Sequence, residues 1–228
     1  MTGRAELLRK AAECFIEAGA YADAARCYDA LGQRWTAADA YARAGETEQA
    51  GEVYRLAGNP EQAAHCFRAL GLTDRAAACW EEYDRPLDAA WELLLVGRPA
   101  GHLLARAAAA GAQPERLALA TGLHEWTEHA DPGPTTRALT LAEHQLSRPG
   151  HRQERQTLLS WALEAAVRTG RLDRGGRLFA AAWRRTEETG HDPELIDQWR
   201  QWAQEHLGGT WGLPAPEAAS PRRGGVRG

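Results

Sequence analysis

A repeat of thirteen residues constrains this chain more than any other feature of its sequence. Six consecutive units run from Ala11 to Asp88 and share the pattern Ala-Ala-x-small-aromatic, three further residues, then Gly, with Asp84 once in place of the Gly. The aromatic position is occupied by Phe15, Tyr28, Tyr41, Tyr54, Phe67 and Trp80, and a seventh unit begins at Ala89. A fixed period of this kind is typical of an array of stacked elements. No catalytic constellation repeats with it.

Each unit has the pattern of one short helix and a turn. At 100° per residue, positions 1, 4, 5 and 8 fall within about 100° of arc, so we expect them to face the core. Position 3 points away and is mostly polar. The Gly at position 9 suits a left-handed C-cap, and Asn59 and Pro60 suit the cap and the first turn of the next helix. The sequence predicts helices of about ten residues, too short to be stable alone.

The stretch from Ala57 to Phe67 resembles the second helix of a tetratricopeptide-like repeat, with a Gly, paired Ala and an aromatic in place. Two units make a helical hairpin of 26 residues, whereas a tetratricopeptide pair has 34. Coatomer-like and intraflagellar-transport-like helical arrays are more similar in this respect. The resemblance covers roughly residues 4–97. It implies an all-α fold, a right-handed α-solenoid of antiparallel helical hairpins, and a role in binding protein partners.

The register fades after Gly97, and Gly and Pro then recur about every twenty residues. We therefore expect a short-helix repeat array over 1–97, a tetratricopeptide-like continuation with longer helices and a C-terminal capping helix over 98–207, and a disordered tail over 208–228. The longer helices are predicted at 99–110, 114–130, 134–147, 152–169, 172–189 and 193–207, with a break in the second at Gly122. The first and last helices both have one apolar face, which favours a complete array.

The four cysteines, Cys14, Cys27, Cys66 and Cys79, all occupy position 4 of their units. We interpret them as reduced, buried core residues, because free Cys is among the most buried residue types. Zinc sites favour two cysteines separated by two residues, whereas here twelve residues separate Cys14 from Cys27 and Cys66 from Cys79. A disulfide between neighbouring units is geometrically possible, but a cytosolic setting argues against it.

Composition bears on the compartment and on the class of partner. The chain has one Lys, one Asn and one Met beside abundant Ala, Arg and Gly, which points to a GC-rich, bacterial genome. It lacks a long apolar run and a signal-peptide core, so we expect a cytoplasmic protein without membrane contact. The net charge is −4, and the tail from residue 213 contributes +2, which leaves −6 on the helical body. Such a body is a poor surface for nucleic acid.

The sequence also argues against catalysis. His124 and His129 enclose Glu125 and Glu128, but they are five residues apart, whereas a zincin helix needs four. An i,i+4 surface pair of Glu125 with His129 explains the segment equally well. There is no Gly-rich phosphate loop and no Ser in a nucleophile elbow. We predict a non-enzymatic protein without a cofactor or a metal.

The sequence predicts that this protein binds another protein or an extended peptide in a solenoid groove. Pro60 and Pro86 open the fifth and seventh units, so odd units are expected to line the groove. Their outward side chains give the candidate partner-binding residues Asp39, Arg43, His65 and Arg68. The same residues also suit a merely solvated face. The alternative function is an accessory or regulatory subunit of a bacterial multi-gene signalling or defence system that recognises a peptide or small ligand.

Two further expectations concern single side chains. Arg43 and Arg68 lie 25 residues apart, close to one hairpin, so both are expected to contact acidic groups of a partner without affecting stability. Tryptophan is abundant, and four of the nine lie in the last helices: Trp161, Trp183, Trp199 and Trp202. Core packing and an exposed docking patch both remain open for these four.

Overall fold

The structure is a computed structural model that describes residues 2–189 and 193–209. Within these ranges it contains thirteen helices and no strand, which confirms the predicted all-α class, and within each of the two compact units named below consecutive helices pack on one another as in a solenoid. The predicted tail lies outside the described residues from 210 onward. The chain divides into two compact units, residues 1–110 and 111–228, called unit 1 and unit 2 below.

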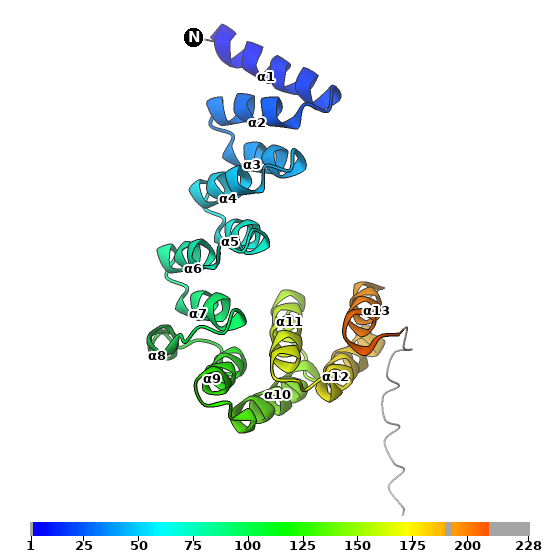
Figure 1. Cartoon of the computed structure of the whole chain (residues 1–228). Helices are drawn as coiled ribbons and strands as arrows, with labels where there is room; N and C mark the ends of the chain where they lie inside the picture. The colour runs from blue at the N-terminus through cyan, green and yellow to red at the C-terminus, as the bar shows by residue number, and fades with distance from the viewer. Residues whose placement is uncertain (1, 190–192, 210–228) are drawn as a thin grey trace, which may run out of the picture. The chain divides into compact units, whose positions relative to one another are not determined.

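Unit 1 is a column of short antiparallel helices. Each helix packs on the next, and the even-numbered helices α4 and α6 lie on one side of the column while α3, α5 and α7 lie on the other (Figure 1). The helices are α1 (Thr2–Glu17), α2 (Tyr21–Ala30), α3 (Arg34–Arg43), α4 (Thr47–Leu56), α5 (Pro60–Ala69), α6 (Thr73–Glu82), α7 (Pro86–Leu95) and α8 (Gly101–Ala109). Six of them, α2 to α7, have ten residues each, as the repeat predicts.

The turn between successive thirteen-residue repeats has a recurring backbone conformation. Gly58 has φ 81°, the left-handed conformation that a glycine adopts without a Cβ clash, and the Asn59 amide donates to the Tyr54 carbonyl at 3.0 Å. The Asn59 side chain then accepts from the Gln62 amide at 3.2 Å and caps α5. Asp84 is the one exception at the glycine position of the six full units, and it adopts the same conformation with φ 52°.

The buried stripe differs from the predicted one. The most completely buried residues are at positions 1 and 2 of the repeat, where paired alanines such as Ala63 and Ala64 are fully buried. Position 8 was expected in the core, but Leu70 and Tyr83 are exposed there. The reason is that an interior helix of a solenoid has two neighbours, so it buries both alanines, whereas position 8 lies at the C-cap beyond the contact.

The aromatic side chains are buried to different depths. Phe67 is 1% exposed, and Tyr54 and Trp80 are buried. The aromatic side chains of the first three thirteen-residue repeats are only half-buried, so the prediction that the aromatic position faces the core is wrong for those repeats. Phe67 has space because Gly51 replaces the usual alanine: a Cβ there would lie 3.0 Å from the ring. The guanidinium of Arg75 covers the ring at 4.1 Å from its centroid.

The cysteines, like the aromatic residues, are more buried in the later repeats than in the first ones. All four are free thiols, Cys66 and Cys79 are buried and Cys27 is half-buried, but Cys14 is exposed, against the prediction. Cys14 lies on α1, the first helix of the array, which packs mainly against α2. Burial raises the pKa of the Cys66 thiol and raises that of Cys79 to about 11.

We therefore expect a thiol reagent at pH 8 to modify the cysteines in a fixed order. Cys14 should react first and Cys27 next, while Cys66 and Cys79 should react only on unfolding, because a buried thiol with a raised pKa holds little thiolate. Mass spectrometry of the labelled peptides gives the order. Equally fast labelling of Cys14 and Cys79 in the folded protein would contradict this packing.

The helices of unit 2 have 15 to 17 residues and are longer than α2 to α8 of unit 1. They are α9 (Pro114–His129), α10 (Pro132–Leu146), α11 (Arg152–Arg168), α12 (Asp173–Thr189) and α13 (Pro193–Leu207), which confirms the predicted segments within two residues. Helix α10 packs against α9, α11 and α12, so these contacts are not limited to consecutive helices. Helix α9 continues through Gly122 and does not break there as predicted. The glycine instead allows α10 to approach closely, since a Cβ at this position would lie 2.8 Å from Thr135 Cα.

The tryptophans of α11 and α13 belong to the core of unit 2. Trp161, Trp199 and Trp202 are buried, and Trp183 is half-buried. Phe179 packs edge-on against Trp199 with ring centroids 5.1 Å apart. Trp161, Trp199 and Trp202 are therefore core residues and do not form an exposed docking patch.

Candidate interaction surface

The odd-numbered helices α3 and α5 expose two equivalent rows of side chains. Each row contains four residues from positions 12, 3, 6 and 7 of the repeat, which share one helix face because they are spaced by three or four. We call the eight residues the odd-helix stripe: Trp35, Asp39, Ala42 and Arg43 on α3, and Glu61, His65, Arg68 and Ala69 on α5. All eight are exposed. The structure therefore brings the four predicted partner-binding residues to one surface.

The stripe does not continue onto α7. The equivalent positions there hold Leu87, Trp91 and Leu94, and all three are buried. The face of α3 and α5 is therefore open to solvent, whereas the same face of α7 is buried.

Trp35 is the most unusual member of the stripe. Its side chain is 55% exposed, and it is the only tryptophan in the described part of the chain with an exposed side chain. The indole packs edge-on against the ring of Tyr54 on α4, with centroids 6.4 Å apart and planes at 77°. Sequence reasoning missed Trp35, although a signal existed: the same position of the neighbouring units holds Ala22 and Glu48.

Asp39 lies one helical turn after Trp35 and is tied to the same tyrosine. The Tyr54 hydroxyl donates a hydrogen bond to Asp39 Oδ1. Burial of the ring, and then this hydrogen bond, raise the pKa of Tyr54, so the phenol stays protonated and remains a donor. No arginine, lysine or histidine lies within ion-pair distance of Asp39 in the residues that the structure describes.

The two arginines of the stripe differ in their surroundings. Arg43 donates to the Tyr21 hydroxyl at 2.7 Å, and its guanidinium lies 4.1 Å from the centroid of the Tyr21 ring. Arg68 instead forms a two-pronged ion pair with Glu92 on α7, at 2.9 Å from Nε to Oε2 and 2.5 Å from Nη2 to Oε1. The two arginines that were expected to make equivalent partner contacts therefore have different surroundings in this chain.

The Arg68 ion pair belongs to the core of unit 1. Glu92 is only 3% exposed, and the Trp80 indole N–H also donates to its Oε1 at 3.1 Å. A buried carboxylate that loses its cation is strongly destabilising. The prediction that reversal of Arg68 leaves stability unchanged therefore conflicts with the geometry of Glu92.

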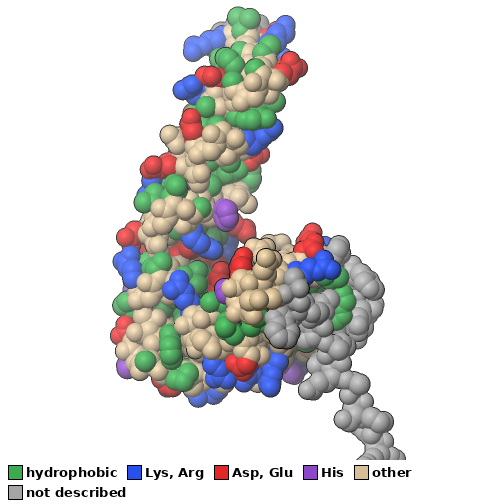
Figure 2. Space-filling model, turned by 45° about the vertical axis from the view of Figure 1, so that its right-hand side comes forward, with side chains coloured by type: hydrophobic (Ala, Val, Ile, Leu, Met, Phe, Trp, Pro, Cys, Tyr) green, Lys and Arg blue, Asp and Glu red, His purple; other side chains and the backbone are tan. Residues whose placement is uncertain are grey.

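The even-numbered helices carry a different kind of surface. Arg55 on α4 pairs with Glu82 on α6 at 2.9 Å, and Arg75 on α6 pairs with Glu48 and Glu52 on α4. Arg106 on α8 forms a further ion pair with Glu81 on α6 at 3.1 Å. Figure 2 shows acidic and basic side chains interspersed along the column of unit 1 on the face that it presents. These charges are largely matched within the chain.

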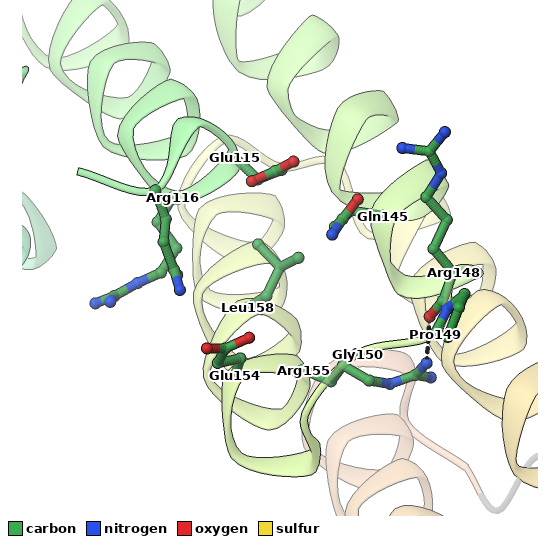
Figure 3. Close-up of a pocket in the computed structure, with 10 residues that line it drawn as sticks. Glu115, Arg116, Gln145, Arg148, Pro149, Gly150, Glu154, Arg155 and Leu158 are labelled. Atoms are coloured by element: carbon green, nitrogen blue, oxygen red, sulfur yellow. Dashed lines mark hydrogen bonds between the residues drawn. The ribbon is translucent and has the colours of Figure 1, made fainter. Parts of the chain in front are cut away.

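Unit 2 contains an open polar cleft between the starts of α9 and α11 and the end of α10. Its volume is about 220 Å³, and Glu115, Gln145 and Leu158 point into it (Figure 3). Two of the arginines that line it have structural contacts. Arg155 donates to the carbonyls of Arg148 and Ala182 at 2.7 and 3.1 Å, and the Arg116 guanidinium lies 3.9 Å from the centroid of the Trp161 ring.

The histidine segment of α9 forms the surface pair that its spacing predicts. His129 Nδ1 lies 3.1 Å from Glu125 Oε2 at the end of the helix. No group of three potential metal ligands comes together among the residues with described positions. None of the described helices is both long enough and apolar enough to cross a bilayer.

Comparisons with models of known protein families, with curated proteins and with solved structures found no match.

Proposed function

We propose that this protein is a non-enzymatic scaffold or adaptor whose odd-helix stripe binds an extended segment of a partner protein. The observation that supports it most is the exposure of Trp35 beside charged and small side chains on one helical face. A large aromatic residue is costly to leave in water, and tryptophan is enriched where binding energy concentrates. In the same proposal, the array is tetratricopeptide-like, and the protein acts in a bacterial cytoplasm.

The spacing of the stripe supports an extended ligand. Asp39 on α3 and His65 on α5 occupy the same unit position and are separated by one 26-residue hairpin. A partner that runs along the column therefore meets the same register position twice, with a different side chain each time. Ala42 and Ala69 keep the surface between the larger side chains low, which lets a peptide backbone approach.

The cleft of unit 2 is the described concavity that suits the alternative function, a regulatory subunit that recognises a small ligand. Its volume of about 220 Å³ is below the range of roughly 300–1,000 Å³ that is usual for such ligands. Arg155 and Arg116 are also held by backbone carbonyls and by Trp161. We therefore favour the protein-binding function.

Replacement of Trp35 by alanine tests the proposal. We expect affinity capture of the partner from the native host to fall about tenfold or more, because loss of a hot-spot aromatic costs about 2 kcal/mol or more. The matched control is Leu56→Ala, which removes a side chain of similar exposure, 52%, from the even-numbered helix α4. Capture measured by quantitative mass spectrometry should be unchanged for this control. Equal recovery with both variants would place the partner elsewhere.

A further inference from the structure

We infer that Trp35 and Asp39 together form a site for a cationic side chain of the partner, an arginine or a lysine. This inference rests on the proposed function, since it assigns the chemistry of the group that the odd-helix stripe receives. It differs from the expectation made from the sequence, in which arginines of this chain bind acidic groups of the partner.

The three side chains of the site hold one another in place. Tyr54 is buried, packs edge-on against the Trp35 indole and donates its hydroxyl hydrogen to Asp39. Trp35 and Asp39 are four residues apart on α3, so an indole and a carboxylate lie on the same face of one helix. The indole is the best of the aromatic rings for a cation, and the carboxylate supplies the opposite charge.

The aromatic rings of this protein show how such a site is filled. Among the described residues, guanidinium groups lie over aromatic rings at 3.9 to 4.5 Å from the centroid, for example Arg43 over Tyr21, Arg75 over Phe67, Arg85 over Trp80 and Arg116 over Trp161. Trp35 is more exposed than any of these rings, and no arginine or lysine of the described chain covers it. A cation from a partner would complete the same arrangement.

The carboxylates of α4 and α6 contrast with Asp39 in their ion pairs. Glu48, Glu52 and Glu82 are paired with arginines of this chain on the even-numbered helices. Asp39 has the Tyr54 hydroxyl as its partner but no cation in the described part of the chain. It is therefore a charge that an incoming arginine or lysine can match.

The charge of unit 1 favours a basic partner as well. Residues 1–110 contain 16 acidic and 12 basic side chains, while the rest of the chain has equal numbers of both. The negative charge of the protein therefore resides on the unit that carries the odd-helix stripe. Complementary charge of this kind raises the association rate and selects among partners.

Two peptides of equal length, acetyl-(Gly-Arg)₄-amide and acetyl-(Gly-Glu)₄-amide, test the inference directly on the full chain. We expect the arginine peptide to shift the Trp35 indole N–H resonance in a saturable way that weakens with salt, and the glutamate peptide to leave it unchanged. Assignment of the resonance comes from its loss in Trp35→Phe.

Two variants separate a cation site from an apolar anchor. Trp35→Leu keeps an apolar side chain but removes the aromatic face, and Asp39→Asn keeps an acceptor for Tyr54 but removes the charge. Each should weaken binding of the arginine peptide about three- to tenfold, measured by fluorescence anisotropy of the same peptide with fluorescein in place of the acetyl group. The control Leu56→Ala should bind like the unchanged protein.

The outcomes distinguish this inference from the proposed function. If Trp35→Leu binds the arginine peptide as tightly as the unchanged protein, or if neither peptide binds, the cation site is wrong. If partner capture nevertheless depends on Trp35, the interaction function stands and Trp35 acts as an apolar anchor. If the arginine peptide binds as expected but capture is independent of Trp35, the site is confirmed and the proposed partner surface is wrong.

Discussion

Replacement of Arg68 by alanine is expected to lower the free energy of unfolding by about 3–5 kcal/mol, although Arg68 is exposed. The reason is its partner: Glu92 is 3% exposed and accepts two hydrogen bonds from the guanidinium and one from the Trp80 indole. Without Arg68, a buried carboxylate loses its cation. Urea denaturation followed by circular dichroism measures the loss.

Two further variants show whether Glu92 is the cause. Arg43→Ala removes another exposed arginine, which contacts Tyr21 and not a buried carboxylate, and should cost under about 1 kcal/mol. In a Glu92→Gln background the cost of Arg68→Ala should shrink, because a neutral amide needs no cation. A loss that is the same in both backgrounds would mean that Arg68 does not act through Glu92.

Replacement of Phe67 by alanine should cost about 3–5 kcal/mol, as other large core truncations do. Its ring is 1% exposed, fills the space left by Gly51 and is covered by Arg75. Tyr41→Ala removes the aromatic of the same unit position from a half-buried site, so we expect under about 2 kcal/mol. Chemical denaturation of the two variants gives the comparison, and equal losses would contradict the graded burial of the aromatics.

The backbone of unit 1 was largely predictable because local interactions define it. The glycine at position 9, the cap of Asn59 and Pro60 at the first turn of α5 each act within a few residues, and they gave the helix bounds. The core stripe was less predictable. A helix considered alone has one apolar face, but in the array it has two neighbours, so position 2 is buried and position 8 is not.

The candidate surface was predictable in place but not in chemistry. The repeat alone put Asp39, Arg43, His65 and Arg68 on the odd-numbered helices. The pairing of Arg68 with Glu92 spans 24 residues and crosses from α5 to α7, and no local pattern indicates it. Trp35 was visible as an outlier at its unit position, but its exposure depends on how α3 packs against α4.

Photo-crosslinking from two exposed alanines tests most directly whether the odd-helix stripe binds the partner. A photoreactive amino acid at Ala42 on α3 reports on the stripe, and the same residue at Ala78 on the even-numbered helix α6 is the matched control, since both side chains are exposed. In the native host, the proposed function predicts a single major crosslinked protein from position 42 that is absent from position 78 and lost in Trp35→Ala. A crosslink from position 78 alone would contradict it.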